Sequence, residues 1–283
     1  MSGTRLWLAI VMIAGLLSTA FVAGCGDDEE GSGDSGGSAD VETLTEGELF
    51  VGTDAPFEPF EIGTPEDPDF TGYDIEVMNA IGEELGLEVT YQNTGFNAIF
   101  RDTANGLFDT AAAASTITEE REQVVDFTDP YYEAQQALLV AEDSDIATVD
   151  DLSDATVGAQ DGTTGETYAN DETEASEVRG FEQGPDAVNA LVTGQVDAVI
   201  IDEPVAVDAV ESTDGVEVAE TIQTDELYGF AVAPDNDGLR EAMNEALATL
   251  KEDGTLADLY EEYFPGVEPS ENVLGENTLL TDE

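Results

Sequence analysis

Residues 114–121 (Ala-Ser-Thr-Ile-Thr-Glu-Glu-Arg) bring together the groups that bind a small charged solute. The segment offers the hydroxyl of Thr116, free backbone groups and the guanidinium of Arg121. A guanidinium is a planar double donor that pairs well with a carboxylate. Because the chain has 66 acidic and only 6 basic residues, an arginine here is not routine surface chemistry. The combination suits the head group of an amino acid, although Arg121 can also be a surface partner of its neighbouring glutamates.

Two further positions offer groups that complement this segment. Asp202 directly follows the apolar run 198–201 and supplies a counter-charge for an ammonium group. Thr164 is predicted to open a helix, and the free N–H groups of a helix start attract an anion. Each residue also has a plainer interpretation as a helix N-cap, which for Asp202 agrees with the proline two residues later.

The elements that must position these residues alternate along the chain. Strands are predicted over 49–52, 87–91, 108–113, 156–159, 177–181 and 196–201, and helices over 73–85, 97–105, 164–170, 185–192, 204–210, 238–251 and 255–264. A helix is also expected to begin at Thr118. Such alternation predicts largely parallel sheets flanked by helices. Two series of this kind, with crossings at 131–139 and 222–232, predict two lobes joined by two strands.

The candidate residues lie at the ends of the predicted strands. Four candidate segments each follow a predicted apolar strand: residues 53–54, 114–116 and 160–164, and Asp202. Ligands of open α/β sheets bind at the carboxyl ends of the strands. We therefore expect these residues to meet in a cleft between the lobes.

Several motifs in a fixed order make the pattern more specific. They are GTDAPFEPF at 52–60, GYDIE at 72–76, TITEER at 116–121, DFTDPYY at 126–132, GTT at 162–164 and DAVIID at 197–202. In this order they resemble extracellular solute-binding family 3, the polar amino-acid binding proteins of ABC importers. The resemblance implies a two-lobed periplasmic-binding-protein type II fold of the α/β class, with mostly parallel sheets and two hinge strands. Lobe 1 is expected over 45–133 and 226–266, and lobe 2 over 134–225.

The resemblance also implies roles for the head-group residues. It places an α-carboxylate on Arg121, the amide of Thr116 and Thr164. It places the α-ammonium on Asp202, the carbonyl of Ala114 and the hydroxyl of Thr116. The family often has glycine or serine where Ala114 stands, so a side-chain hydroxyl contact is lost here.

Four other residues match positions that surround the ligand's side chain. Phe57 and Phe96 match aromatic walls, and ordinary core packing is the alternative for both. Asp54 and Gln160 match polar positions, although an aspartate in so acidic a chain is often a solvated surface charge. Together they suit a basic or amide side chain.

The N-terminal region has the features of a targeting segment. Residues 1–24 are expected to be a signal peptide that ends at a lipobox, with a lipid on Cys25, the only cysteine. A cleaved signal peptide with an incidental cysteine and an uncleaved anchor helix are the alternatives. Residues 25–44 are expected to form a flexible acidic linker, and residues 267–283 an acidic tail without regular structure.

A formal net charge of −60 excludes some partners and indicates a habitat. Nucleic acid and anionic membrane surfaces repel such a chain. Folding against this self-repulsion needs strong screening, and the Debye length falls to roughly 3 Å at about 1 M salt. We interpret the acidity as adaptation to high salt.

We therefore expect a monomeric lipoprotein on the outer face of the cytoplasmic membrane. It captures a free amino acid and delivers it to an ABC permease, without a cofactor or a metal ion. The alternatives are an enzyme of the same fold, such as a dehydratase, and an amino-acid sensor domain. The lack of histidine and of a second cysteine excludes histidine bases, Cys–His pairs and His–metal sites.

Overall fold

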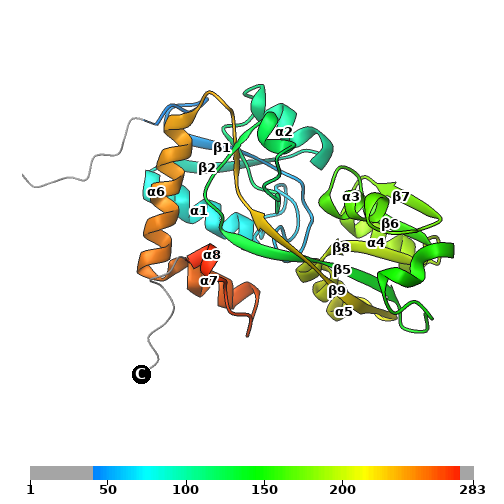
Figure 1. Cartoon of the computed structure of the whole chain (residues 1–283). Helices are drawn as coiled ribbons and strands as arrows, with labels where there is room; N and C mark the ends of the chain where they lie inside the picture. Colours follow the sequence, from blue (N-terminus) through cyan, green and yellow to red (C-terminus); the bar gives the residue numbers. More distant parts are fainter. Residues whose placement is uncertain (1–40, 275–283) are drawn as a thin grey trace, which may run out of the picture. The chain divides into compact units, whose positions relative to one another are not determined.

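The computed structural model describes residues 41–274. The predicted signal peptide, Cys25, residues 25–40 of the predicted linker and residues 275–283 of the predicted tail lie outside the described residues. The described residues fold around two five-stranded sheets, each of which forms the centre of one lobe (Figure 1). Within this part of the chain, no helix is long and apolar enough to cross a membrane.

The first sheet has the strand order β2-β1-β3-β10-β4. Its strands are β1 (Glu48–Thr53), β2 (Glu88–Asn93), β3 (Thr110–Ala111), β4 (Asp126–Phe127) and β10 (Ala231–Val232). β1 is parallel to β2 and β3, whereas β10 is antiparallel to β3 and β4. Four helices belong to this lobe: α1 (Tyr73–Leu85), α2 (Phe96–Ala104), α6 (Asp237–Asp253) and α7 (Thr255–Tyr263).

Helices cover both faces of the first sheet because successive side chains point to opposite sides of a strand. Ala112 and Ala114 belong to the apolar cluster that includes α1, α6 and α7. Ala111 and Ala113 belong to the cluster that includes α2. Alternate side chains of this short alanine run therefore pack into two different apolar clusters. Because these side chains are small, they leave room for the cleft at the end of the run.

The second sheet has the strand order β7-β6-β8-β5-β9. Its strands are β5 (Tyr132–Ala141), β6 (Thr156–Gln160), β7 (Glu177–Phe181), β8 (Ala198–Asp202) and β9 (Val216–Tyr228). The flanking helices are α3 (Thr164–Asp171), α4 (Gly184–Val192), α5 (Glu203–Ser212) and the 3₁₀ helix η2 (Val149–Asp154). β6 is parallel to β7 and β8, whereas β5 is antiparallel to β8 and β9, so both sheets are mixed.

The two crossing strands are β5 and β9, which lie side by side (Figure 1). They pair from Tyr132 opposite Tyr228 to Ala141 opposite Val216. Tyr132 and Tyr228 pack with Phe60, Tyr260 and other rings at centroid distances of 5.0–5.5 Å. This aromatic cluster ties the start of the hinge to the C-terminal helices of the first lobe.

Most predicted elements are confirmed, and two segments differ. The predicted strand over 108–113 is reduced to Thr110–Ala111, because Ala114 adopts a left-handed φ of 42° and turns the chain away. No α-helix begins at Thr118. A single 3₁₀ turn (Arg121–Gln123) forms instead, since β4 starts three residues later.

The expectation of unstructured chain at both ends of the fold is wrong for the residues that the structure describes. In the predicted tail, Val273 and Leu274 of helix α8 (Glu271–Leu274) are buried in the core. In the predicted linker, the backbone N–H of Leu44 donates to Asp109 at 2.7 Å. Apolar side chains and one buried carboxylate hold these segments against the fold.

Candidate functional site

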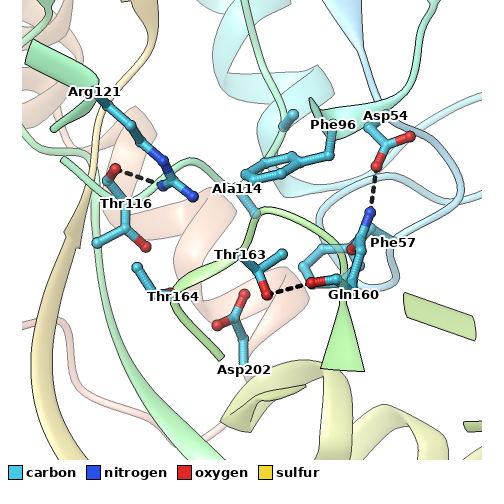
Figure 2. Close-up of a pocket in the computed structure, with 11 residues that line it drawn as sticks. Asp54, Phe57, Phe96, Ala114, Thr116, Arg121, Gln160, Thr163, Thr164 and Asp202 are labelled. Carbon is cyan, nitrogen blue, oxygen red and sulfur yellow. Dashed lines mark hydrogen bonds between the residues drawn. The ribbon is translucent and has the colours of Figure 1, made fainter. Parts of the chain in front are cut away.

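One pocket between the lobes brings together all nine residues that were predicted to contact a ligand (Figure 2). They are Asp54, Phe57, Phe96, Ala114, Thr116, Arg121, Gln160, Thr164 and Asp202, and Ala113 and Thr163 complete the lining. The empty space, which includes the part open to solvent, measures about 300 Å³. No set of three or more His, Cys, Asp or Glu within residues 41–274 is arranged to hold a metal ion.

Arg121 is buried at one end of the pocket, with 9% of its surface exposed. Its Nη1 donates to the carbonyl of Thr116 at 2.7 Å and its Nη2 to the carbonyl of Gly162 at 3.2 Å, which links the two lobes. The guanidinium carbon lies 5.0 and 4.8 Å from the ring centroids of Phe96 and Phe100. Among the described residues, no carboxylate forms an ion pair with it. The predicted alternative of a surface partner is therefore wrong, and the guanidinium has donors left for an anion.

Ala114 owes its place to a buried aspartate that the sequence reasoning did not select. The backbone N–H of Ala114 donates to Asp74 at 2.8 Å, and the hydroxyl of Tyr131 donates to both carboxylate oxygens at 2.8 Å. Burial raises the pKa of Asp74 to about 6. Burial and the neighbouring Asp74 also raise the pKa of Glu61. These contacts hold the turn at Ala114 that ends the strand at the pocket.

Asp202 stands at the end of β8, as predicted, and its side chain does not cap α5. It accepts a hydrogen bond from the amide of Gln136 in β5. Burial and the negative charge of Glu226 raise the pKa of Asp202 to about 7, against the opposing effect of Arg121. A carboxylate with a raised pKa in a closed pocket is suited to bind a cation, because the cation restores the charged form.

Thr164 begins α3, as predicted, but the capping residue is its neighbour Thr163. The hydroxyl of Thr163 accepts a hydrogen bond from the N–H of Glu166 at 3.1 Å. The hydroxyl of Thr164 instead donates to Glu226 at 2.7 Å. The interpretation of Thr164 as an N-cap is therefore wrong, and the first turn of α3 keeps backbone N–H groups for an anion.

Asp54 forms the other end of the pocket, directly after β1. Its Oδ2 accepts a hydrogen bond from Gln160 of the second lobe at 2.6 Å, and no hydrogen bond from the described part of the chain reaches its buried Oδ1. With only 5% of its surface exposed, Asp54 is not a solvated surface charge, and burial raises its pKa to about 6. Phe57 and Phe96 line the pocket and also belong to the hydrophobic clusters, so both rings pack in the core and their predicted role as walls around a ligand stays a prediction.

Sequence reasoning missed three buried polar residues around the pocket: Gln136, Glu226 and Asp74. Gln136 had a usable signal, because it is a polar residue inside the apolar run that became β5. Asp74 lies in the motif GYDIE, which assigned it no role, and Glu226 had no signal, because one acid among 66 cannot be distinguished without knowing which ones are buried.

The fold and the pocket define a two-lobed solute-binding protein whose ligand site lies between the lobes. The sequence profile of bacterial extracellular solute-binding proteins, family 3, matches residues 49–266, and the chain belongs to this family.

Two relatives and one solved structure illustrate the similarity. The chain is 31% identical over 220 residues to the ABC transporter arginine-binding protein 1 of Escherichia coli (strain K12), covering 76% of this chain and 89% of the relative. It is 30% identical over 268 residues to the arginine-binding extracellular protein ArtP of Bacillus subtilis (strain 168), covering 92% and 98%. The structure of an ancestral arginine-binding protein bound to arginine superimposes with a TM-score of 0.73 at 37% identity, covering 77% and 98%.

Proposed function

We propose that this protein captures a free amino acid with a basic side chain and delivers it to an ABC importer. One observation carries the proposal: within residues 41–274, the buried guanidinium of Arg121 has no ion-pair partner and a buried carboxylate oxygen of Asp54 has no hydrogen bond, and both groups line the pocket. An amino acid such as arginine complements both, with its α-carboxylate at Arg121 and its cationic side chain at Asp54. The relatives named for arginine binding support this choice.

In this proposal each residue of the pocket has a definite role. The α-carboxylate pairs with Arg121 and with backbone N–H groups at Thr116 and at the start of α3. The α-ammonium lies between Asp202, the carbonyl of Ala114 and the hydroxyl of Thr116. The aliphatic part of the ligand's side chain passes between Phe57 and Phe96, and its cationic end meets Asp54 and Gln160.

Closure of the lobes over the ligand gives the importer a form to recognise. Contacts already cross the cleft at Arg121–Gly162 and at Gln160–Asp54. A ligand favours this closed form only by its higher affinity for it. Binding rather than catalysis is our proposal, since the named relatives are binding proteins.

A thermal-shift screen of the twenty amino acids in molar KCl tests this function. We expect arginine, and more weakly lysine, to raise the unfolding midpoint of the wild type by several degrees, about what saturation at a hundred times Kd provides. Asp54→Asn is expected to lose most of this shift while the midpoint without ligand stays the same or rises, because the raised pKa of Asp54 shows that its charge is unfavourable there. A larger shift with glutamate or leucine than with arginine in the wild type would refute the basic pocket. No shift with any amino acid would refute the function.

We also propose that Cys25 carries a lipid that anchors the protein to the outer face of the cytoplasmic membrane. The small residues before the only cysteine support this, as does the apolar run that precedes them. Radiolabelled palmitate is expected to label the wild type, and Cys25→Ala is expected to be unlabelled and released into the medium. Retention of the variant in the membrane would favour an uncleaved anchor.

Three further features complete the proposal. We propose a monomer whose lobes divide near 133/134 and 225/226, close to where β5 begins and β9 ends. We also propose adaptation to high salt, on the basis of the net charge of −60. The screen, repeated at submolar KCl, is expected to give a lower unfolding midpoint for the ligand-free protein, and an unchanged midpoint would count against that adaptation.

A further inference from the structure

Glu226 enters the cleft from an irregular point of the hinge. At this point one residue of β5, Gln135, lies opposite the three residues 223–225 of β9. The side-chain oxygen of Gln135 holds the bulge by accepting hydrogen bonds from two of its backbone N–H groups, at 2.6 and 3.1 Å. Bulges of this kind re-aim the side chains that follow them. Here the carboxylate of Glu226 ends at the cleft with only 8% of the residue exposed.

The carboxylate of Glu226 receives hydrogen bonds from three different parts of the fold. Its Oε2 accepts the hydroxyl of Thr116, in the first lobe, at 2.6 Å. The same oxygen accepts the hydroxyl of Thr164, in the second lobe, at 2.7 Å. Its Oε1 accepts from the amide of Gln136 in the hinge at 3.1 Å, and that amide also donates to Asp202. One carboxylate therefore joins both lobes and the hinge.

These bonds determine what the two threonine hydroxyls can do for a ligand. A hydroxyl has one proton to donate and two lone pairs that accept. Because both protons are directed to Glu226, Thr116 and Thr164 present only acceptors to the pocket. They can contact an ammonium group but cannot donate to a carboxylate. The α-carboxylate must then rely on Arg121 and on backbone N–H groups.

We infer that Glu226 is a positioning residue that makes the hydroxyls of Thr116 and Thr164 acceptors for the α-ammonium of the ligand. This inference rests on the proposed function. Glu226 does not line the amino-acid pocket, whereas both threonines do, so it acts through them. It differs from Asp202, which lines the pocket and faces the ammonium directly.

A double-mutant cycle with Thr164 tests the inference. The ligand is the amino acid that the screen selects, L-arginine in the expected case. Glu226→Gln is expected to weaken binding about ten-fold, since the new amide donates to one hydroxyl and turns its proton toward the ligand. Thr164→Val is expected to weaken binding to a similar extent. The double variant is expected to bind about as well as the weaker single variant, because the two residues act as one unit.

A ligand without the ammonium group provides a second readout. Binding of 5-guanidinopentanoate, which is arginine without its α-amino group, is expected to change less than about two-fold in Glu226→Gln. Glu217→Gln, an exposed acid on the same strand, is the matched control and is expected to bind both ligands like the wild type. Unfolding midpoints of the ligand-free variants monitor the fold.

Two results would overturn the inference while leaving the proposed function intact. Additive losses in the cycle would show that Glu226 acts by its charge alone. Equal losses for L-arginine and 5-guanidinopentanoate would show a general effect on the fold or on closure. Failure of the wild type to bind any amino acid would refute the proposed function itself, and this inference with it.

Discussion

Arg121→Ala is expected to weaken binding of the amino acid at least about a hundred-fold, the usual effect of truncating one member of a buried, hydrogen-bonded charge pair. The guanidinium has no carboxylate ion-pair partner among the described residues, and in the proposed function the ligand's α-carboxylate takes that place. The variant also loses the contact from Arg121 to Gly162, which helps to hold the cleft closed. Isothermal titration in molar KCl measures the loss.

Two further substitutions show whether the effect is specific to Arg121. Arg101→Ala removes an arginine that is 66% exposed and pairs with Asp102, and it is expected to leave binding unchanged. Arg121→Lys keeps the charge without the planar fork and is expected to recover only part of the affinity. If Arg121→Ala bound as tightly as the wild type, Arg121 would have no place in the ligand site.

Asp202→Asn is expected to weaken binding to a comparable extent, about a hundred-fold, because a buried ammonium is left without its counter-charge. The wild type should also lose affinity as the pH falls through about 7, where Asp202 in the ligand-free protein takes up a proton. The asparagine variant should lose this part of the pH dependence. Binding titrations between about pH 5.5 and 8.5 record both effects, because this range extends roughly one and a half pH units to either side of the pKa of Asp202.

The stability of the ligand-free protein should respond to pH in the opposite direction. Folding raises the pKa of Asp202 from 3.8 to about 7. The folded protein therefore holds this proton more tightly than the unfolded chain does. The resulting stabilisation is complete below about pH 4 and is lost as the pH rises through about 7. Asp202→Asn should therefore be at least as stable as the wild type above pH 7 while binding more weakly. A variant destabilised at every pH would indicate a structural role instead.

Asp214→Asn is the control for the effects of Asp202. Asp214 is exposed in the turn before β9, so its substitution is expected to change neither the affinity for the ligand nor the pH dependence of that affinity. If Asp214→Asn reproduced the changes seen with Asp202→Asn, the cause would be the general charge of the protein and not the site.

Local sequence patterns were sufficient for most of the fold. The helix predicted over 73–85 and the strand predicted over 177–181 have the same bounds in the structure. In α1 the apolar side chains at Ile75, Met78 and Ile81 are all buried, as helical spacing requires. Segments whose conformation depends on distant partners were predicted less well. The helix that was predicted to begin at Thr118 does not form, because the side chain of Arg121 turns inward to the carbonyls of Thr116 and Gly162.

Most of the pocket residues could be predicted because they lie at the end of a strand or at the start of a helix, next to a local pattern. Asp54 and Asp202 follow apolar strands, and Thr164 opens a helix. Asp54 ends a strand of the first sheet and Asp202 a strand of the second, so their meeting in one pocket also depends on the hinge strands that join the two lobes. The partners of these residues could not be predicted in the same way, because Gln136 and Glu226 reach the site from the hinge strands.

Sequence alone was enough to establish the α/β class, the two series of elements and the candidate residues, because periodicity and strand ends are local properties. Tertiary structure decided which acids are buried and which hydroxyls are already engaged. In a chain with 66 acidic residues, the identity of an aspartate or glutamate says little about its role. Packing buries Asp54, Asp74 and Glu226 and partly buries Asp202, and each of the four accepts a hydrogen bond from a donor in a distant part of the chain. Burial and hydrogen bonding between distant segments give these carboxylates their function, and neither is a property of the local sequence.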